Sequence, residues 1–163
     1  FGSLDLCLRS SAEDTDLEVT VSEVRPDGLE VYVQSGWLRA SQRALNEAES
    51  TDSFPVHTHL EADAMPLPEG EFSLTRVQIF PFAHPFRAGS RIRVTVDAPG
   101  GARPTWAFAD TLPGGELNEI AQDSEHQSRL VLSIVPGVDV PPGLPDCGSL
   151  RSQPCRPYVA LGD

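Results

Sequence analysis

The sequence predicts an all-β protein in which two antiparallel sheets pack as a jelly-roll β-sandwich. Apolar residues recur at every second position in several short segments, which is the period of a half-buried strand. Fifteen prolines and thirteen glycines among 163 residues indicate many turns and few long helices. Long connections between the strand-like segments suit a jelly roll, whose chain crosses from one sheet to the other.

The N-terminal quarter of the chain contains three of the predicted strands. Residues 4–9 place their leucines on one face, and residues 17–24 alternate in a similar way. The segment 25–28 reads Arg-Pro-Asp-Gly and predicts a turn, because proline presets φ and glycine accepts a positive φ. Residues 29–38 then read as the returning strand of a hairpin, rich in residues that favour strands.

The middle of the chain contains the one segment with helical spacing. Residues 39–54 carry a weak apolar stripe, which predicts a helix or a coil insert. Residues 56–62 alternate and predict an edge strand. Further strands are expected at 72–80, 91–96 and 130–135.

We expect a sandwich domain over residues 1–136 and a proline-rich extension over residues 137–163. Proline is already extended and loses little entropy on docking, so the extension is expected to pack on the same sandwich. Cys147 and Cys155 bracket a short loop and could pair as a disulfide, which would leave Cys7 over. Such a disulfide favours a secreted or extracytoplasmic location. The three cysteines lack the close pairs of a zinc site.

The charge of the chain disfavours several kinds of partner. Twelve basic residues against 24 acidic ones give a net charge of −12, and every basic residue is an arginine. The arginines form no cluster, so we expect neither nucleic acid nor an anionic membrane surface as a partner. The absence of lysine removes Schiff-base chemistry and a phosphate-loop lysine. The excess of acidic residues is best explained by solubility.

The sequence contains no specific pattern for catalysis. An α/β-hydrolase places its nucleophilic serine in Gly-x-Ser-x-Gly, and no such pentapeptide occurs. A phosphate loop, His-Glu-x-x-His and a dinucleotide fingerprint are also missing. We therefore predict no catalytic residue and no cofactor within this chain.

One histidine-rich segment is a weak candidate for a metal site. If it is extended, four potential ligands share one face: His57, His59, Glu61 and Asp63. The same alternation describes a solvated strand face with Leu60 turned inward, and that interpretation is favoured. Residues 13–16 resemble a fragment of a calcium loop, but they lack its glycine and its distal glutamate, which favours a solvated turn.

Trp37 and Trp106 bear on a second hypothesis. An exposed tryptophan on a sandwich would suggest stacking on a sugar ring, and thus a carbohydrate-binding module. Packing in a core or an interface is the commoner role of tryptophan. The carbohydrate-binding module is therefore the alternative function.

Four segments carry further motifs: SEVRPDGLEVYVQSGWLRASQR, MPLPEGE, VQIFPFAHPFRAGSRIRVTV and NEIAQDSEHQSRLVLSIVP. In this order they resemble the C-terminal domain of the X-prolyl dipeptidyl-peptidase and cocaine esterase (CocE/NonD) hydrolase family. The resemblance implies a galactose-binding-like jelly roll that follows an α/β-hydrolase domain with a helical cap. Ser90 departs from the family pattern, in which a histidine often follows the Ala-Gly pair.

The resemblance also implies a function, that of the non-catalytic accessory domain of a serine hydrolase acting on acyl esters or X-prolyl peptides. Such a domain would brace the hydrolase and cap domains of its own chain and lend loops to the rim of the active site. The oligomeric state stays open. Loops rich in aromatic residues and arginine supply the candidates for this rim or interface: Trp37, Arg39, Phe82, Phe86, Trp106 and Phe108.

His84 lies in a corner between two predicted strands. We expect Phe82 and Phe86 to anchor this corner in apolar surface, and His84 to satisfy a buried backbone group rather than to bind a ligand.

Overall fold

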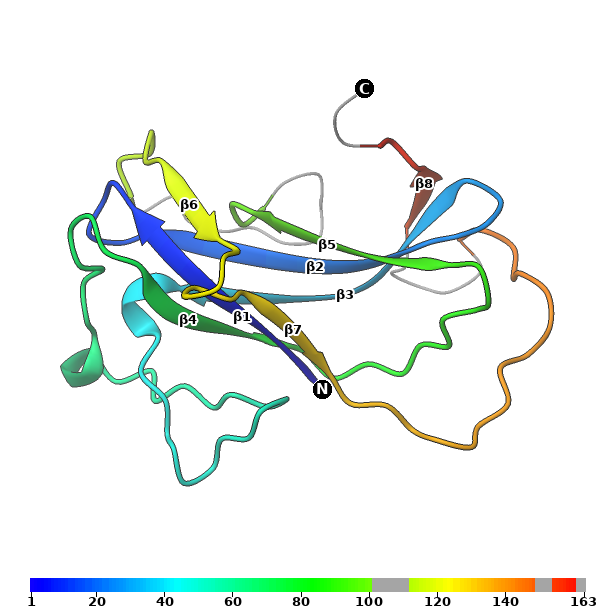
Figure 1. Cartoon of the computed structure of the whole chain (residues 1–163), viewed down its shortest axis with the longest axis horizontal. Coiled ribbons are helices and arrows are strands. Elements are labelled where there is room, and N and C mark those ends of the chain that lie inside the picture. The colour runs from blue at the N-terminus through cyan, green and yellow to red at the C-terminus, as the bar shows by residue number, and fades with distance from the viewer. Residues whose placement is uncertain (101–111, 149–153, 161–163) are drawn as a thin grey trace.

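The computed structural model of the protein describes residues 1–100, 112–148 and 154–160. Within these ranges the chain forms eight strands and two short 3-10 helices, and it contains no α-helix. The strands make two antiparallel sheets, and β1 runs obliquely across β2 and β3 in Figure 1, as expected for stacked sheets. The predicted all-β sandwich is confirmed. No helix in the described ranges is long and apolar enough to cross a membrane.

Sheet A is built around β1 (Gly2–Ser10). Along one edge, residues Gly2 to Leu8 of β1 pair with the whole length of β4 (Ser73–Ile79). Two shorter strands, β6 (Asn118–Ala121) and β7 (Arg129–Leu132), follow one another along the other edge. The early residues of β1 therefore meet β7, and its late residues meet β6.

Sheet B has the strand order β5-β2-β3-β8. Its centre is the hairpin of β2 (Asp16–Val24) and β3 (Leu29–Arg39). The connecting turn places Gly28 at φ +82°, a conformation that glycine adopts without steric cost. The edges of the sheet are β5 (Arg91–Asp97) and the short β8 (Cys155–Pro157).

The hydrophobic core lies between the two sheets. Among the described strands, five connections lead from one sheet to the other: β1–β2, β3–β4, β4–β5, β5–β6 and β7–β8. At one point the sheets approach closely, because a Cβ atom on Gly36 would lie 1.7 Å from the carbonyl oxygen of Gln78. Only glycine permits this contact. The core side chains come from both sheets and include Leu4, Leu6, Leu8, Leu17, Val19, Val21, Val33, Val77 and Ile79.

Most strands predicted from alternation are present, with small shifts at their ends. The strand predicted at 130–135 ends at Leu132, since Leu132 pairs with Gly2 and β1 offers little beyond that residue to pair with. The short strands β6 and β8 were not predicted, because four and three residues are too few to show a period.

Of the two predictions for the middle of the chain, the strand at 56–62 is wrong, whereas the segment 39–54 takes the second of its two predicted forms, a coil insert. That segment contains only the 3-10 helix Ala40–Gln42, and the rest of it is irregular. No strand forms at 56–62, where Leu45 and His57 form a single bridge and His59 has a φ of +51°. The 3-10 helix Glu61–Asp63 follows, and Leu60 is exposed instead of turned inward.

The proline-rich extension returns to sheet B. β8 pairs with the first residues of β3, and Arg25 Nη1 donates to the carbonyl oxygen of Pro145 at 2.8 Å. Cys147 and Cys155 form a disulfide between the approach to β8 and its first residue, with their Cα atoms 5.6 Å apart. Part of the β3 edge is thereby covered by the chain itself.

Candidate functional site

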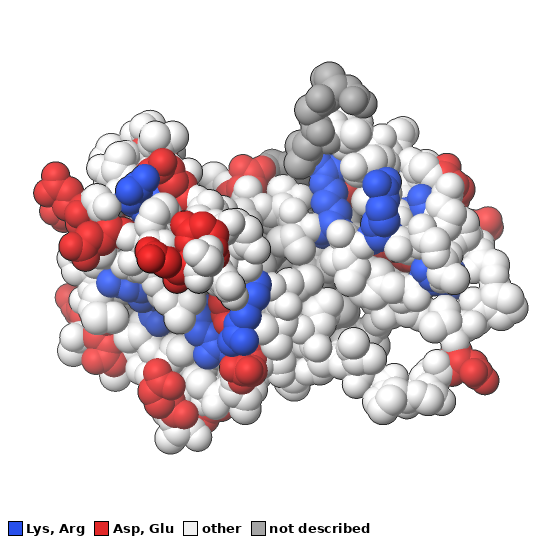
Figure 2. Space-filling view, in the orientation of Figure 1, with Lys and Arg blue, Asp and Glu red and all other residues white. Residues whose placement is uncertain are grey.

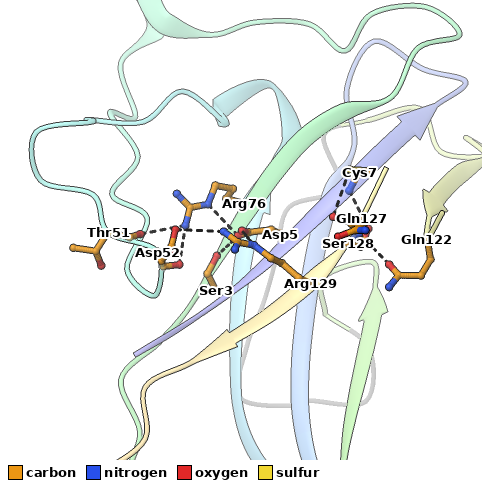
Figure 3. Close-up of polar contacts among 10 residues, drawn as sticks. All are labelled: Ser3, Asp5, Cys7, Thr51, Asp52, Arg76, Gln122, Gln127, Ser128 and Arg129. Atoms are coloured by element: carbon orange, nitrogen blue, oxygen red, sulfur yellow. Dashed lines mark hydrogen bonds and ion pairs between the residues drawn. The ribbon is translucent and has the colours of Figure 1, made fainter. Parts of the chain in front are cut away.

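The outer face of sheet A carries a buried carboxylate, that of Asp5 on β1. Its neighbours Leu4 and Leu6 enter the core, so alternation turns Asp5 to the opposite face. Asp5 accepts hydrogen bonds from Ser3 Oγ at 2.6 Å, Arg76 Nε at 3.0 Å and Arg129 Nε at 2.9 Å. Figure 3 shows the two arginines reaching Asp5 from opposite sides, because β4 and β7 flank β1.

The same arginines fasten a loop onto this face. Arg76 Nη2 donates to the carbonyl oxygens of Thr51 and Asp52, and Arg129 Nη2 lies 3.3 Å from the Asp52 carboxylate (Figure 3). Each hydrogen bond of Asp5 named here has an ionised acceptor and is therefore charge-assisted, and Arg76 in turn holds the loop backbone. A carboxylate so engaged anchors structure and has little capacity to act as a general base.

A second buried carboxylate, that of Glu23 on β2, lies on the inner side at the end of the hairpin. It continues the inward phase of Val19 and Val21. His84 Nε2 lies 2.7 Å from one carboxylate oxygen, and Ser90 Oγ donates to the other at 2.6 Å. The expected backbone partner of His84 is therefore wrong, since the carboxylate of Glu23 takes that place.

This Ser-Glu-His group differs from a catalytic triad in its order. In a triad the histidine stands between serine and carboxylate and accepts the serine proton, whereas here Glu23 stands between Ser90 and His84. Burial, the largest influence, acts to raise the pKa of Glu23, but the hydrogen bonds from Ser90 and His84 outweigh it and lower that pKa. The group therefore holds a stable carboxylate and does not activate the serine.

A third buried carboxylate, that of Glu30 on β3, joins the tail to sheet B. Arg93 Nη1 lies 3.1 Å from it, and Arg156 contributes two contacts of 3.3 Å from β8. Burial acts to raise the pKa of Glu30, but the hydrogen bond from Arg156 and the positive charge of Arg156 contribute to lowering it. The pKa of Glu30 is therefore below its ordinary value. The ring of Tyr158 lies against the guanidinium groups of Arg91 and Arg93.

A cavity of about 870 Å³ bordered by described residues lies where β2 begins and β3 ends. Two of the predicted rim residues, Trp37 and Arg39, line it. Arg39 forms a two-pronged ion pair with Asp16, at 2.8 and 2.7 Å. The Trp37 ring lies 5.3 Å from that of Phe80. This region of the sandwich is called the cavity end below.

The other predicted rim residues are not gathered at that cavity. Phe82 and Phe86 pack against the core, as expected for the anchors of the corner at His84, and the His84 and Phe86 rings lie 4.9 Å apart. Trp106 and Phe108 lie outside the described residues. The sugar-stacking hypothesis stays a prediction, and the half-buried Trp37 packed on Phe80 gives it no support.

The histidine-rich segment does not present its four potential ligands on one face, because it is not a strand. The rings of His57 and His59 lie 5.6 Å apart, and the described part of the chain contains no group of three or more potential ligands for a metal ion. Burial and, second, the neighbouring His59 lower the pKa of His57. In residues 13–16, Asp14 accepts from the Ser41 backbone N–H, and Asp16 pairs with Arg39.

Sequence reasoning missed the burial of Asp5, Glu23 and Glu30, and also that of Glu18, a fourth carboxylate that is buried in the described residues. For Glu23 a signal exists, since positions 17, 19 and 21 are apolar and 23 continues their phase. A charged residue at an inward position requires a partner, which could have directed attention to His84. Asp5 gives no such signal, because an outward carboxylate next to leucines looks solvated until the loop that covers it is known.

The described residues thus form a β-sandwich whose buried carboxylates act as anchors. The family model described as "X-Pro dipeptidyl-peptidase C-terminal non-catalytic domain" matches residues 1–131. The chain belongs to this family, and the resemblance noted in the sequence is confirmed.

Curated relatives and solved structures agree with this assignment. A protein of Mycobacterium bovis and one of Mycobacterium tuberculosis, both titled "Putative serine esterase", are 28% identical to the chain over 133 residues. That match covers 80% of this chain and 20% of theirs, so the chain spans about a fifth of the length of these relatives. Two structures of a CocE/NonD family hydrolase from Staphylococcus aureus share the fold, with a TM-score of 0.69 and identities of 23% and 22%. They are matched over 80% of this chain and 27% and 26% of their own.

Proposed function

We propose that the chain is the accessory domain of a serine hydrolase acting on acyl esters or X-prolyl peptides, and that it braces the catalytic part of the same polypeptide. The catalytic part here means the hydrolase and cap domains. The observation that carries the proposal is the match of residues 1–131 to a non-catalytic C-terminal domain. The curated relatives titled as serine esterases support the chemistry of the parent.

The structure suits a bracing role because its polar anchors tie loops to a rigid sandwich. Asp5 holds the loop around Thr51 and Asp52, Glu23 holds the corner at His84, and Glu30 holds the tail. A support that is itself held in this way can keep neighbouring groups close to their productive geometry.

We also propose that the cavity end contributes to the rim of the active site. Pockets form preferentially where domains meet, and Trp37 and Arg39 bring an aromatic ring and a guanidinium group to this cavity. The disulfide of Cys147 and Cys155 supports a secreted or extracytoplasmic location.

The test uses the catalytic part produced separately, to which this domain is added. We expect the domain to associate at micromolar concentration and to restore hydrolysis of a short acyl ester, or to raise the temperature at which that activity is lost. A β-sandwich of similar size and charge serves as control. Absence of association together with unchanged activity and heat stability would contradict the proposal.

A further inference from the structure

Three strands of sheet A end side by side at one border of the molecule. Gly2 pairs with Ile79 of β4 and with Leu132 of β7, so Phe1, Phe80 and Ser133 follow at the same level. The backbone N–H of Ser133 donates to the carbonyl oxygen of Phe1 at 3.4 Å. Figure 1 shows the N-terminus beside the end of β7, in agreement with this register.

The side chains at this border are apolar and exposed. Phe1 is 48% exposed, Phe80 42%, Ile134 84% and Val135 74%. We call these four residues the N-terminal patch. The ring of Phe54 packs on Phe1 at 4.4 Å and extends the apolar surface. The register brings these residues to one border of sheet A, and exposed apolar surface gathered in this way can mark a site of interaction.

The patch stands out on a strongly acidic protein. Figure 2 shows an uncharged band across the middle of the visible face, between charged groups on both sides, and the N-terminus of Figure 1 falls within this band. Elsewhere the chain covers its own sheets, with Asp52 and its loop on sheet A and with β8 and Tyr158 on sheet B. No comparable cover lies over Ile134 and Val135 among the described residues.

We propose that the N-terminal patch is the surface on which the catalytic part of the same polypeptide docks. In the curated relatives about four fifths of the chain lies outside the matched segment, which covers 20% of their length. The family describes a C-terminal domain, so that larger part precedes it. A preceding chain would join the sandwich at Phe1, inside the patch. Because this covalent link keeps the catalytic part close, a modest apolar interface is sufficient. The inference rests on the proposed function and adds where the contact lies.

The test uses the full-length protein with Ile134→Ser and Val135→Ser combined. Both side chains are mostly exposed here, so the sandwich should still fold, which its far-ultraviolet circular dichroism checks. Loss of the apolar contact should free the junction before Phe1, and limited proteolysis there should become at least about five-fold faster. The matched control combines Leu117→Ser and Val159→Ser, which are similarly exposed and lie outside the patch.

Each result decides the proposal. Faster cleavage in the patch variant alone supports it, whereas equal rates in patch and control variants overturn it. Conversion of a full-length dimer to a monomer at an unchanged cleavage rate also overturns it and assigns the patch to a second copy. Deletion of the whole domain separates this failure from failure of the proposed function. If deletion leaves hydrolysis and heat stability unchanged, the proposed function is wrong. If deletion impairs them but the patch variant behaves like its control, the proposed function stands and only the docking surface is wrong.

Discussion

At one end of β2, Glu23 is buried and bonded to His84 and Ser90, whereas at the other end Asp16 and Arg39 form an ion pair beside a cavity. We call the first the anchored end. The cavity there measures about 220 Å³, against about 870 Å³ at the cavity end. Both ends are built from charged residues, but Glu23 and His84 are removed from water, whereas Asp16 and Arg39 stay partly exposed. The difference indicates that the anchored end serves stability and that the cavity end is available for contact with other groups.

The largest effect is expected from Glu23→Ala at the anchored end. The change leaves the buried His84 and Ser90 without their shared acceptor, and breaking a buried pair in this way typically costs about 3–5 kcal/mol. Urea unfolding measures the loss. Glu69→Ala removes an exposed carboxylate and should change the free energy of unfolding by less than about 0.5 kcal/mol. Equal effects of the two substitutions would remove the distinction between the ends.

The Asp5 cluster should rank next, and its two arginines should differ. The Arg76 side chain is 15% exposed and also holds two carbonyl oxygens, whereas that of Arg129 is 55% exposed. We expect Arg76→Met to lower the free energy of unfolding by about 2–3 kcal/mol and Arg129→Met by about 1 kcal/mol or less. Thermal and urea unfolding of both variants check the order. A larger loss of stability in Arg129→Met than in Arg76→Met would contradict this ranking of the two arginines by side-chain exposure.

The alternation of apolar residues explains which strands and which buried residues could be predicted from the sequence. Alternation marks which face of a strand meets the core, so the strands containing Leu4, Val19 and Val33 were found. It does not record which distant segment covers the outer face, and Asp5 was therefore not recognised as buried. At 56–62 the alternation had no partner strand to pair with, and the predicted strand is absent.

The rim residues show the same limit. Trp37 and Arg39 were chosen for their residue types, and they line one cavity because β3 carries both to its end. Phe82 and Phe86 were chosen on the same ground but pack on the core. Composition alone does not distinguish a residue that faces a cavity from one that fills an interior.

The pH dependence of stability should sharpen the description of the anchored end. The folded-state pKa of Glu23 is lower than its ordinary value, so the stability from Glu23 is present above about pH 4.3. It is lost as the pH falls through the folded-state pKa, because the unfolded chain binds the proton first. The Glu23→Gln variant has no group at position 23 that binds a proton in this pH range. Its free energy of unfolding should therefore fall less steeply between about pH 5 and pH 3 than that of the unaltered protein. Parallel slopes would show that Glu23 does not supply this dependence.

The smallest effect on stability is expected at the cavity end, from Arg39→Met. The Arg39 side chain is 36% exposed, and such an ion pair contributes about 1 kcal/mol or less. Arg9→Met is a matched control, since Arg9 has the same exposure and pairs with Glu119, and neither of these two residues lines the cavity. In the full-length protein, a cavity end that lines the active site predicts a higher KM for an acyl ester in Arg39→Met at unchanged kcat, and no change in Arg9→Met. Equal KM values for both variants would contradict a rim role and leave the cavity as a feature of the sandwich alone.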